Sequence, residues 1–78
     1  MTSKIRPKAE KKISEVGPTD LVSLTIRLSS PLTKDEINSL SADGGELMYD
    51  NGTMAVIKIK PVNLGEFLKI ESVVEVVK

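Results

Sequence analysis

The chain has 78 residues, which is enough for one domain, and a domain of this size buries only about 60% of the surface that its unfolded chain exposes. It contains no cysteine, which excludes disulfides and thiolate metal sites. The 11 basic and 11 acidic residues cancel, which argues against a dedicated nucleic-acid or acidic-ligand binder. We therefore expect no nucleic-acid partner.

Nothing in the sequence points to a membrane. No apolar run approaches the roughly 20 residues that span a bilayer, and residues 1–16 lack the apolar stretch of a secretory signal. The absence of cysteine also fits a reducing compartment. These features predict a cytoplasmic protein with no membrane partner.

Residues 1–20 are rich in Lys, Glu, Ser and Pro, and their large apolar side chains are Ile5, Ile13 and Val16. Such a composition buries too little surface to offset the entropy lost on ordering. The sequence predicts a disordered or flexible arm over residues 1–20 and one domain over residues 21–78. A docked helical turn, ended by Gly17-Pro18, is the alternative for the arm.

Two clear patterns predict the first regular elements. Apolar residues alternate with polar ones in a half-buried strand, and the apolar ones are Val22, Leu24, Ile26 and Leu28. Thr33 and Glu36 then have the spacing of a capping box. We expect a helix over residues 34–42 that ends at Gly44-Gly45.

The dipeptide Asn51-Gly52 is a strong hairpin signal, because both residues tolerate the positive φ of a type I′ turn. It joins an expected short strand, residues 47–49, to a longer one, residues 54–60. A two-residue loop fixes the register. The expected cross-strand pairs are Tyr49–Met54, Met48–Ala55 and Leu47–Val56.

Asn63 lies three residues before Glu66, which predicts a second capped helix over residues 64–70 and then a last strand over residues 73–77. The order of elements is βαββαβ. With right-handed crossovers it predicts an α+β, ferredoxin-like sandwich, in which an antiparallel four-stranded sheet carries two helices on one face. We expect the first and third strands at its centre, parallel to each other.

Residues that carry catalysis or bind metals are scarce. The sequence has no histidine and no cysteine, so the usual general base and thiol nucleophile are missing. The carboxylates Asp35 and Glu36 are explained by the helix start, while Asp43, Glu46 and Asp50 lack the spacing of a calcium loop. An RNA-binding sheet would need aromatic residues on its central strands. We expect no catalytic residues, no cofactor and no metal site.

The open face of the expected sheet is more informative. If alternate residues of the third strand face the helices, apolar side chains remain on the other face with basic residues around them. The predicted partner-binding residues are Leu47, Tyr49, Met54, Val56, Arg27 and Lys58. They indicate a protein partner, with a homodimer as the alternative. Two other arrangements would leave no such surface: the arm folds over it, or the two faces are reversed.

Much of residues 22–77 resembles the subtilisin-propeptide and proteinase-inhibitor family. The residues that carry the resemblance are Gly44-Gly45-Glu46-Leu47-Met48-Tyr49, Met54-Ala55, Leu64, Phe67-Leu68 and Glu71-Ser72-Val73-Val74-Glu75-Val76. The resemblance implies an open-faced sandwich that packs its exposed sheet on two surface helices of a subtilisin-like serine protease.

Members of that family also block the protease with an extended C-terminal tail. This chain stops at Lys78, directly after the last expected strand, which counts against tight substrate-like inhibition. Three interpretations stay open: a stand-alone inhibitor, an inhibitor relative that serves only as a docking module, or an unrelated protein on a common fold. The alternative function is a small regulatory or oligomerisation domain that resembles amino-acid-binding domains of the same topology.

Overall fold

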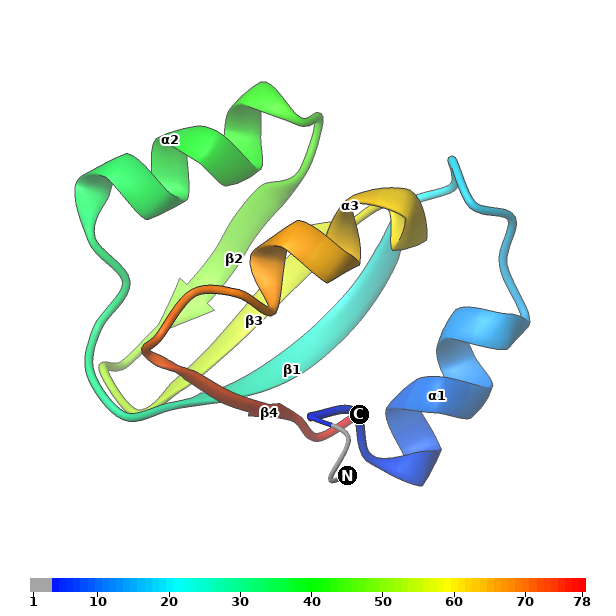
Figure 1. Ribbon diagram of the computed structural model, residues 1–78, viewed down its shortest axis with the longest axis horizontal. Helices are drawn as coiled ribbons and strands as arrows, with labels where there is room; N and C mark the ends of the chain where they lie inside the picture. The colour runs from blue at the N-terminus through cyan, green and yellow to red at the C-terminus, as the bar shows by residue number, and fades with distance from the viewer. Residues whose placement is uncertain (1–3) are drawn as a thin grey trace.

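The computed structural model describes residues 4–78, which form a four-stranded sheet and three helices (Figure 1). The elements in chain order are α1 (Pro7–Ser14), β1 (Val22–Leu28), α2 (Lys34–Ala42), β2 (Glu46–Asp50), β3 (Met54–Ile59), α3 (Pro61–Phe67) and β4 (Val73–Val76). From β1 onward they follow the predicted βαββαβ order, so the chain has an α+β fold of the ferredoxin-like type. Helix α1 precedes this unit.

The strand order of the sheet is β2-β3-β1-β4, which confirms that β1 and β3 are central. Every neighbouring pair is antiparallel, so the expectation that β1 and β3 run parallel is wrong. In a split βαβ unit the parallel strands are the two that one helix connects, and a strand of the other unit lies between them. Here β3 lies between β1 and β2 and runs against both.

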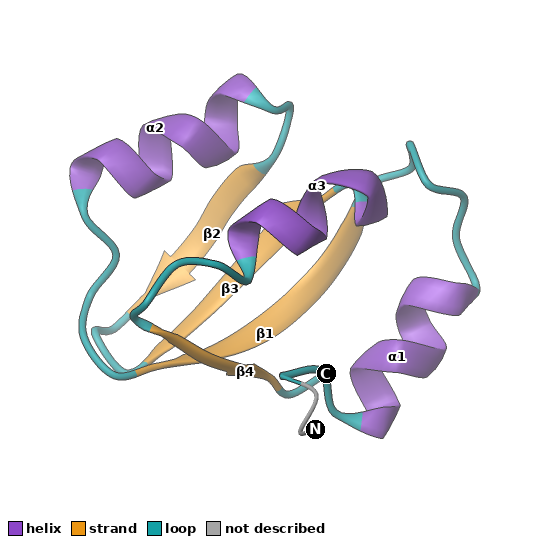
Figure 2. Ribbon diagram, in the orientation of Figure 1, coloured by secondary structure: helices purple, strands orange, loops and turns teal. Residues whose placement is uncertain are grey.

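One face of the sheet carries the core. Helices α2 and α3 lie over that face (Figure 2), and their residues Leu40, Leu64 and Phe67 are buried against the strands. The largest fully buried side chains are Leu24, Ile26, Ile57, Ile59, Val73 and Val76. The strand residues expected to point at the helices therefore do so, and the faces are not reversed.

The observed bounds of α2 match the predicted ones, because hydrogen bonds define both ends. The Thr33 hydroxyl accepts from the Glu36 N–H at 3.2 Å, and the Glu36 carboxylate accepts from the Thr33 N–H at 2.8 Å. At the other end Gly44 has a φ of 85°, and the Gly45 N–H donates to the Leu40 carbonyl at 2.9 Å. These bonds turn the chain sharply from α2 into β2.

The β2–β3 turn is not the expected one. Gly52 has a φ of 92°, but no described residue other than glycine has a positive φ, so Asn51 does not take part in a type I′ turn. The loop is Gly52-Thr53, closed by a bond of 3.0 Å from the Asn51 N–H to the Met54 carbonyl. The Asn51 side chain accepts from the Met54 N–H at 2.8 Å and so fixes the turn from its flank.

The register of β2 on β3 differs for the same reason. Tyr49 lies opposite Val56 and Leu47 lies opposite Ile57, with a bulge between the two pairs. A bulge places two residues of one strand opposite one residue of its neighbour. The predicted pairs Tyr49–Met54, Met48–Ala55 and Leu47–Val56 are all wrong. The loop lies one residue further along, which moves each partner by two positions, and the bulge then moves the partner of Leu47 back by one.

Helix α3 spans Pro61–Phe67, so the predicted start at residue 64 and the predicted end at residue 70 both lie three residues too late. Proline suits the first helical position, where its fixed φ fits the helix and its missing N–H leaves nothing unsatisfied. The expected cap at Asn63 is wrong. Its side-chain amide instead donates to the Asp43 carbonyl at 3.1 Å, which joins α3 to the C-terminal end of α2.

The described part of the N-terminal segment is docked and carries helix α1, which agrees with the alternative for residues 1–20 and not with the expected disorder. Ala9 of α1 is fully buried in the core. Ahead of α1, the chain forms a parallel bridge with the outer edge of β4. There the Arg6 N–H donates to the Val76 carbonyl at 2.9 Å, and the Val76 N–H donates to the Lys4 carbonyl at 2.7 Å. Residues 1–3 of the expected arm lie outside the described residues.

Candidate functional site: the open sheet face

The face of the sheet opposite α2 and α3 is formed by the residues that alternate with the buried ones. Residues directly opposite each other on neighbouring strands share a face, so the register arranges these side chains in three rows across the sheet. We call them the open face: Glu46–Lys58–Ser23, Tyr49–Val56–Thr25 and Met54–Arg27–Glu75.

The centre of the open face is apolar. Val56 lies between Tyr49 of β2 and Thr25 of β1, and Met54 lies two positions away along β3 on the same face. Tyr49 is 55% exposed, while Val56 and Met54 are half-buried by their neighbours. Together they form an apolar surface in the middle of the open face.

The described part of the arm does not cover this surface. Ala9 belongs to the core cluster that includes the helix-facing residues of β1 and β3. Ile5, Ile13 and Val16 pack against that same cluster. Helix α1 therefore extends the helix-side core, and the open face keeps its exposure.

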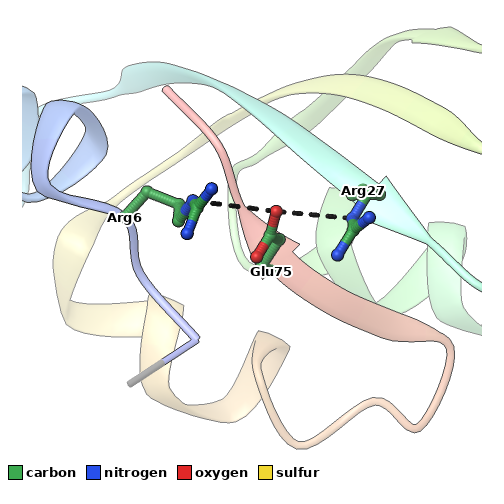
Figure 3. A network of polar contacts seen from close by, with 3 residues as sticks. All are labelled: Arg6, Arg27 and Glu75. Carbon is green, nitrogen blue, oxygen red and sulfur yellow. Dashed lines mark ion pairs between the residues drawn. The ribbon is translucent and has the colours of Figure 1, made fainter. Parts of the chain in front are cut away.

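Arg27 is held by an ion-pair network at one end of the open face (Figure 3). Its Nε lies 3.3 Å from Glu75 Oε1 on β4, and Arg6 Nε lies 3.8 Å from the same oxygen. Ion pairs this exposed stabilise a fold by only about 0–1 kcal/mol. Their main effect is to hold chain segments together, because Glu75 links the N-terminal segment to β1. Glu75 also neutralises Arg27, one of the predicted binding residues.

Lys58 lies near the other end of the open face, opposite Glu46 on β2 and Ser23 on β1. Opposite charges on directly paired residues attract each other. Arg27 thus has a carboxylate partner in Glu75, and Lys58 lies opposite Glu46 in the register. The open face combines an apolar centre with polar ends whose charges nearly cancel.

Leu47 is the predicted binding residue that the structure places elsewhere. It lies opposite the fully buried Ile57 and packs against the core, so it faces the helices. The bulge causes this, because Leu47 and Tyr49 would share a face in a regular strand. The other predicted residues, Tyr49, Met54, Val56, Arg27 and Lys58, come together on the open face.

Two residues near the open face were missing from the prediction. Met48 is 49% exposed at the bulge beside Tyr49, and nothing in the sequence marks that bulge. Glu75 holds Arg27, and a signal for it existed. A ferredoxin-like sheet has its last strand beside its first, as observed here, and this brings the Glu75 carboxylate to Arg27.

No group of 3 or more His, Cys, Asp or Glu residues within residues 4–78 is placed to hold a metal ion. No helix among these residues has the length and apolar character needed to cross a membrane. Comparison of the chain with protein-family models, curated proteins and solved structures finds no match.

Proposed function

We propose that this chain is a non-catalytic protein-binding module that docks its partner through the open face. The observation that carries the proposal is the uncovered row Tyr49–Val56–Thr25 with Met54 beside it. Monomeric proteins rarely leave contiguous apolar surface exposed without a use. An apolar centre with polar ends is also the usual build of a protein interface.

The charges of the open face favour a protein over a nucleic acid. Arg27 is paired with Glu75, and Lys58 lies opposite Glu46, so the open face has no excess of positive charge to attract a phosphate backbone. Tyr49 lies on the edge strand β2, and the open-face positions of β1 and β3 hold no aromatic ring on which a base can stack.

A subtilisin-like serine protease is the partner we propose first. The support is the resemblance of the chain to protease propeptides and inhibitors, whose exposed sheet face is the docking surface. We further propose a cytoplasmic location, in line with the cysteine-free composition.

A homodimer, as in a regulatory or oligomerisation domain, is the second candidate. The outer edge of β4 is paired with the N-terminal segment, whereas within residues 4–78 β2 pairs only with β3. Met48 is 49% exposed on this free edge. Unpaired edge strands are sites where a second chain adds on.

Tyr49→Asp is expected to weaken protease binding at least tenfold, which corresponds to about 1.4 kcal/mol. The substitution removes the exposed aromatic ring of the open face and places a charge against an apolar partner surface. Val62→Asp is the matched control, because Val62 is 63% exposed on α3. Calorimetric titration of each variant with a subtilisin-type protease measures the effect.

The result has three readable outcomes. A loss of protease affinity in Tyr49→Asp alone supports docking through the open face. Equal affinities of the two variants contradict it. No binding of the unmodified chain at micromolar concentration rejects the protease as partner. Sedimentation then decides the second candidate: a dimer supports it, and a strict monomer rejects it.

A further inference from the structure

A groove between α2 and α3 lies on the side of the sheet opposite the open face. The two helices lie next to each other over the sheet (Figure 1), and the groove has a volume of about 390 Å³. The buried residues Leu40, Ile59 and Phe67 form its apolar floor. The bond from Asn63 to the Asp43 carbonyl fixes one end at 3.1 Å. The groove is therefore preformed.

The rim of this groove is acidic. All the ionisable side chains that line it are carboxylates, and they belong to Asp35, Glu36, Asp43 and Glu66. Two of them already have partners. Glu36 accepts a hydrogen bond in the capping box, and Glu66 forms an ion pair of 3.1 Å with Lys69.

The other two carboxylates, on Asp35 and Asp43, form no ion pair with any described residue. Asp43 is the C-cap of α2, where the negative end of the helix dipole makes a carboxylate unfavourable. The Lys60 ammonium lies beside Gly44 but forms no ion pair with Asp43. The Asp43 carboxylate is therefore still open to a cation bound in the groove.

We propose that the α2–α3 groove binds a small organic cation with an apolar body, namely an ammonium or guanidinium group on an aromatic or aliphatic chain. The body packs on Leu40, Ile59 and Phe67, and the cation contacts the carboxylate of Asp43, while Asp35 adds negative charge at the far end of the rim. A volume of about 390 Å³ falls within the roughly 300–1,000 Å³ of small-molecule sites. The site is independent of the open face and of the function proposed for it.

Titration of the isotopically labelled chain with 4-phenylbutylamine tests the proposal. The matched control is 4-phenylbutanoate, which has the same apolar body and the opposite charge. We expect the amine to shift the amides of Leu40, Ile59 and Phe67 in a saturable way, and the carboxylate to leave them unchanged. Added salt is expected to weaken amine binding, because the rim charges are screened.

Asp43→Asn is expected to weaken amine binding about two- to fivefold, the size of one exposed charge contact. Glu10→Gln is the control, because it removes a carboxylate from α1, outside the groove. Equal shifts with amine and carboxylate would overturn the proposal, as would no shift up to about 10 mM amine, or shifts confined to the open face.

Discussion

Replacing Ile57 with alanine is expected to lower the free energy of unfolding by about 2–5 kcal/mol. Ile57 is fully buried in β3, between Leu24 of β1 and Leu47 of β2. Its loss leaves a cavity in the middle of the sheet, where strands paired on both sides limit collapse. A domain of this size has a total stability of about 4–12 kcal/mol, so the loss is a large share of it.

The matched control for this prediction is Val56→Ala, one residue away on the other face of β3. Val56 is half-buried on the open face, so its truncation is expected to cost about 1 kcal/mol or less. Urea unfolding followed by circular dichroism measures both variants. Equal losses would mean that the two faces of β3 are buried alike, which contradicts the structure.

Gly45→Ala is expected to destabilise the fold by about 1–3 kcal/mol. A Cβ at this position would lie 2.6 Å from Leu40 Cδ1 and 2.7 Å from the Lys58 carbonyl oxygen. The carbonyl belongs to β3 and cannot yield without disturbing the pairing of β2 with β3. Gly45 is therefore required by close packing where α2 turns into β2.

The control is Gly65→Ala, which we expect to stabilise the fold by up to about 1 kcal/mol. A Cβ at Gly65 would meet nothing within 4 Å, and alanine is the better helix former in α3. The two substitutions should thus move the thermal midpoint in opposite directions. An unchanged or raised midpoint in Gly45→Ala would contradict the close packing at Gly45.

Elements defined by short-range bonds were predictable from sequence. The capping box of Thr33 and Glu36 fixed the start of α2, and Gly44 with its positive φ fixed its end. The alternation in β1 also identified the buried face correctly. Each of these signals is complete within a few residues of the chain, so no distant contact competes with it.

Sequence patterns whose outcome depends on a distant partner led to wrong predictions. Asn63 had the spacing of a cap, but its side chain bonds to the Asp43 carbonyl, twenty positions back in the chain. Asn51-Gly52 predicted the hairpin, yet the loop moved to Gly52-Thr53 and a bulge turned Leu47 to the core. Local sequence cannot show the packing that selects such a bulge.

The order of the N-terminal segment has the same physical cause. Its composition is too polar to fold alone, but the free edge of β4 gives it a place to dock. In the structure this edge supplies backbone partners for Lys4 and Arg6, and the core receives Ala9. Order in this segment depends on a surface built by residues far away in the chain.

The most direct test of the open face is a map of amide shifts in the labelled chain during titration with a subtilisin-type protease. The proposed function predicts that perturbed amides cluster in the row Tyr49–Val56–Thr25 and at Met54 and Arg27, and that amides of α2 and α3 stay unchanged. A map centred on α2 and α3, with the open face unperturbed, would contradict it.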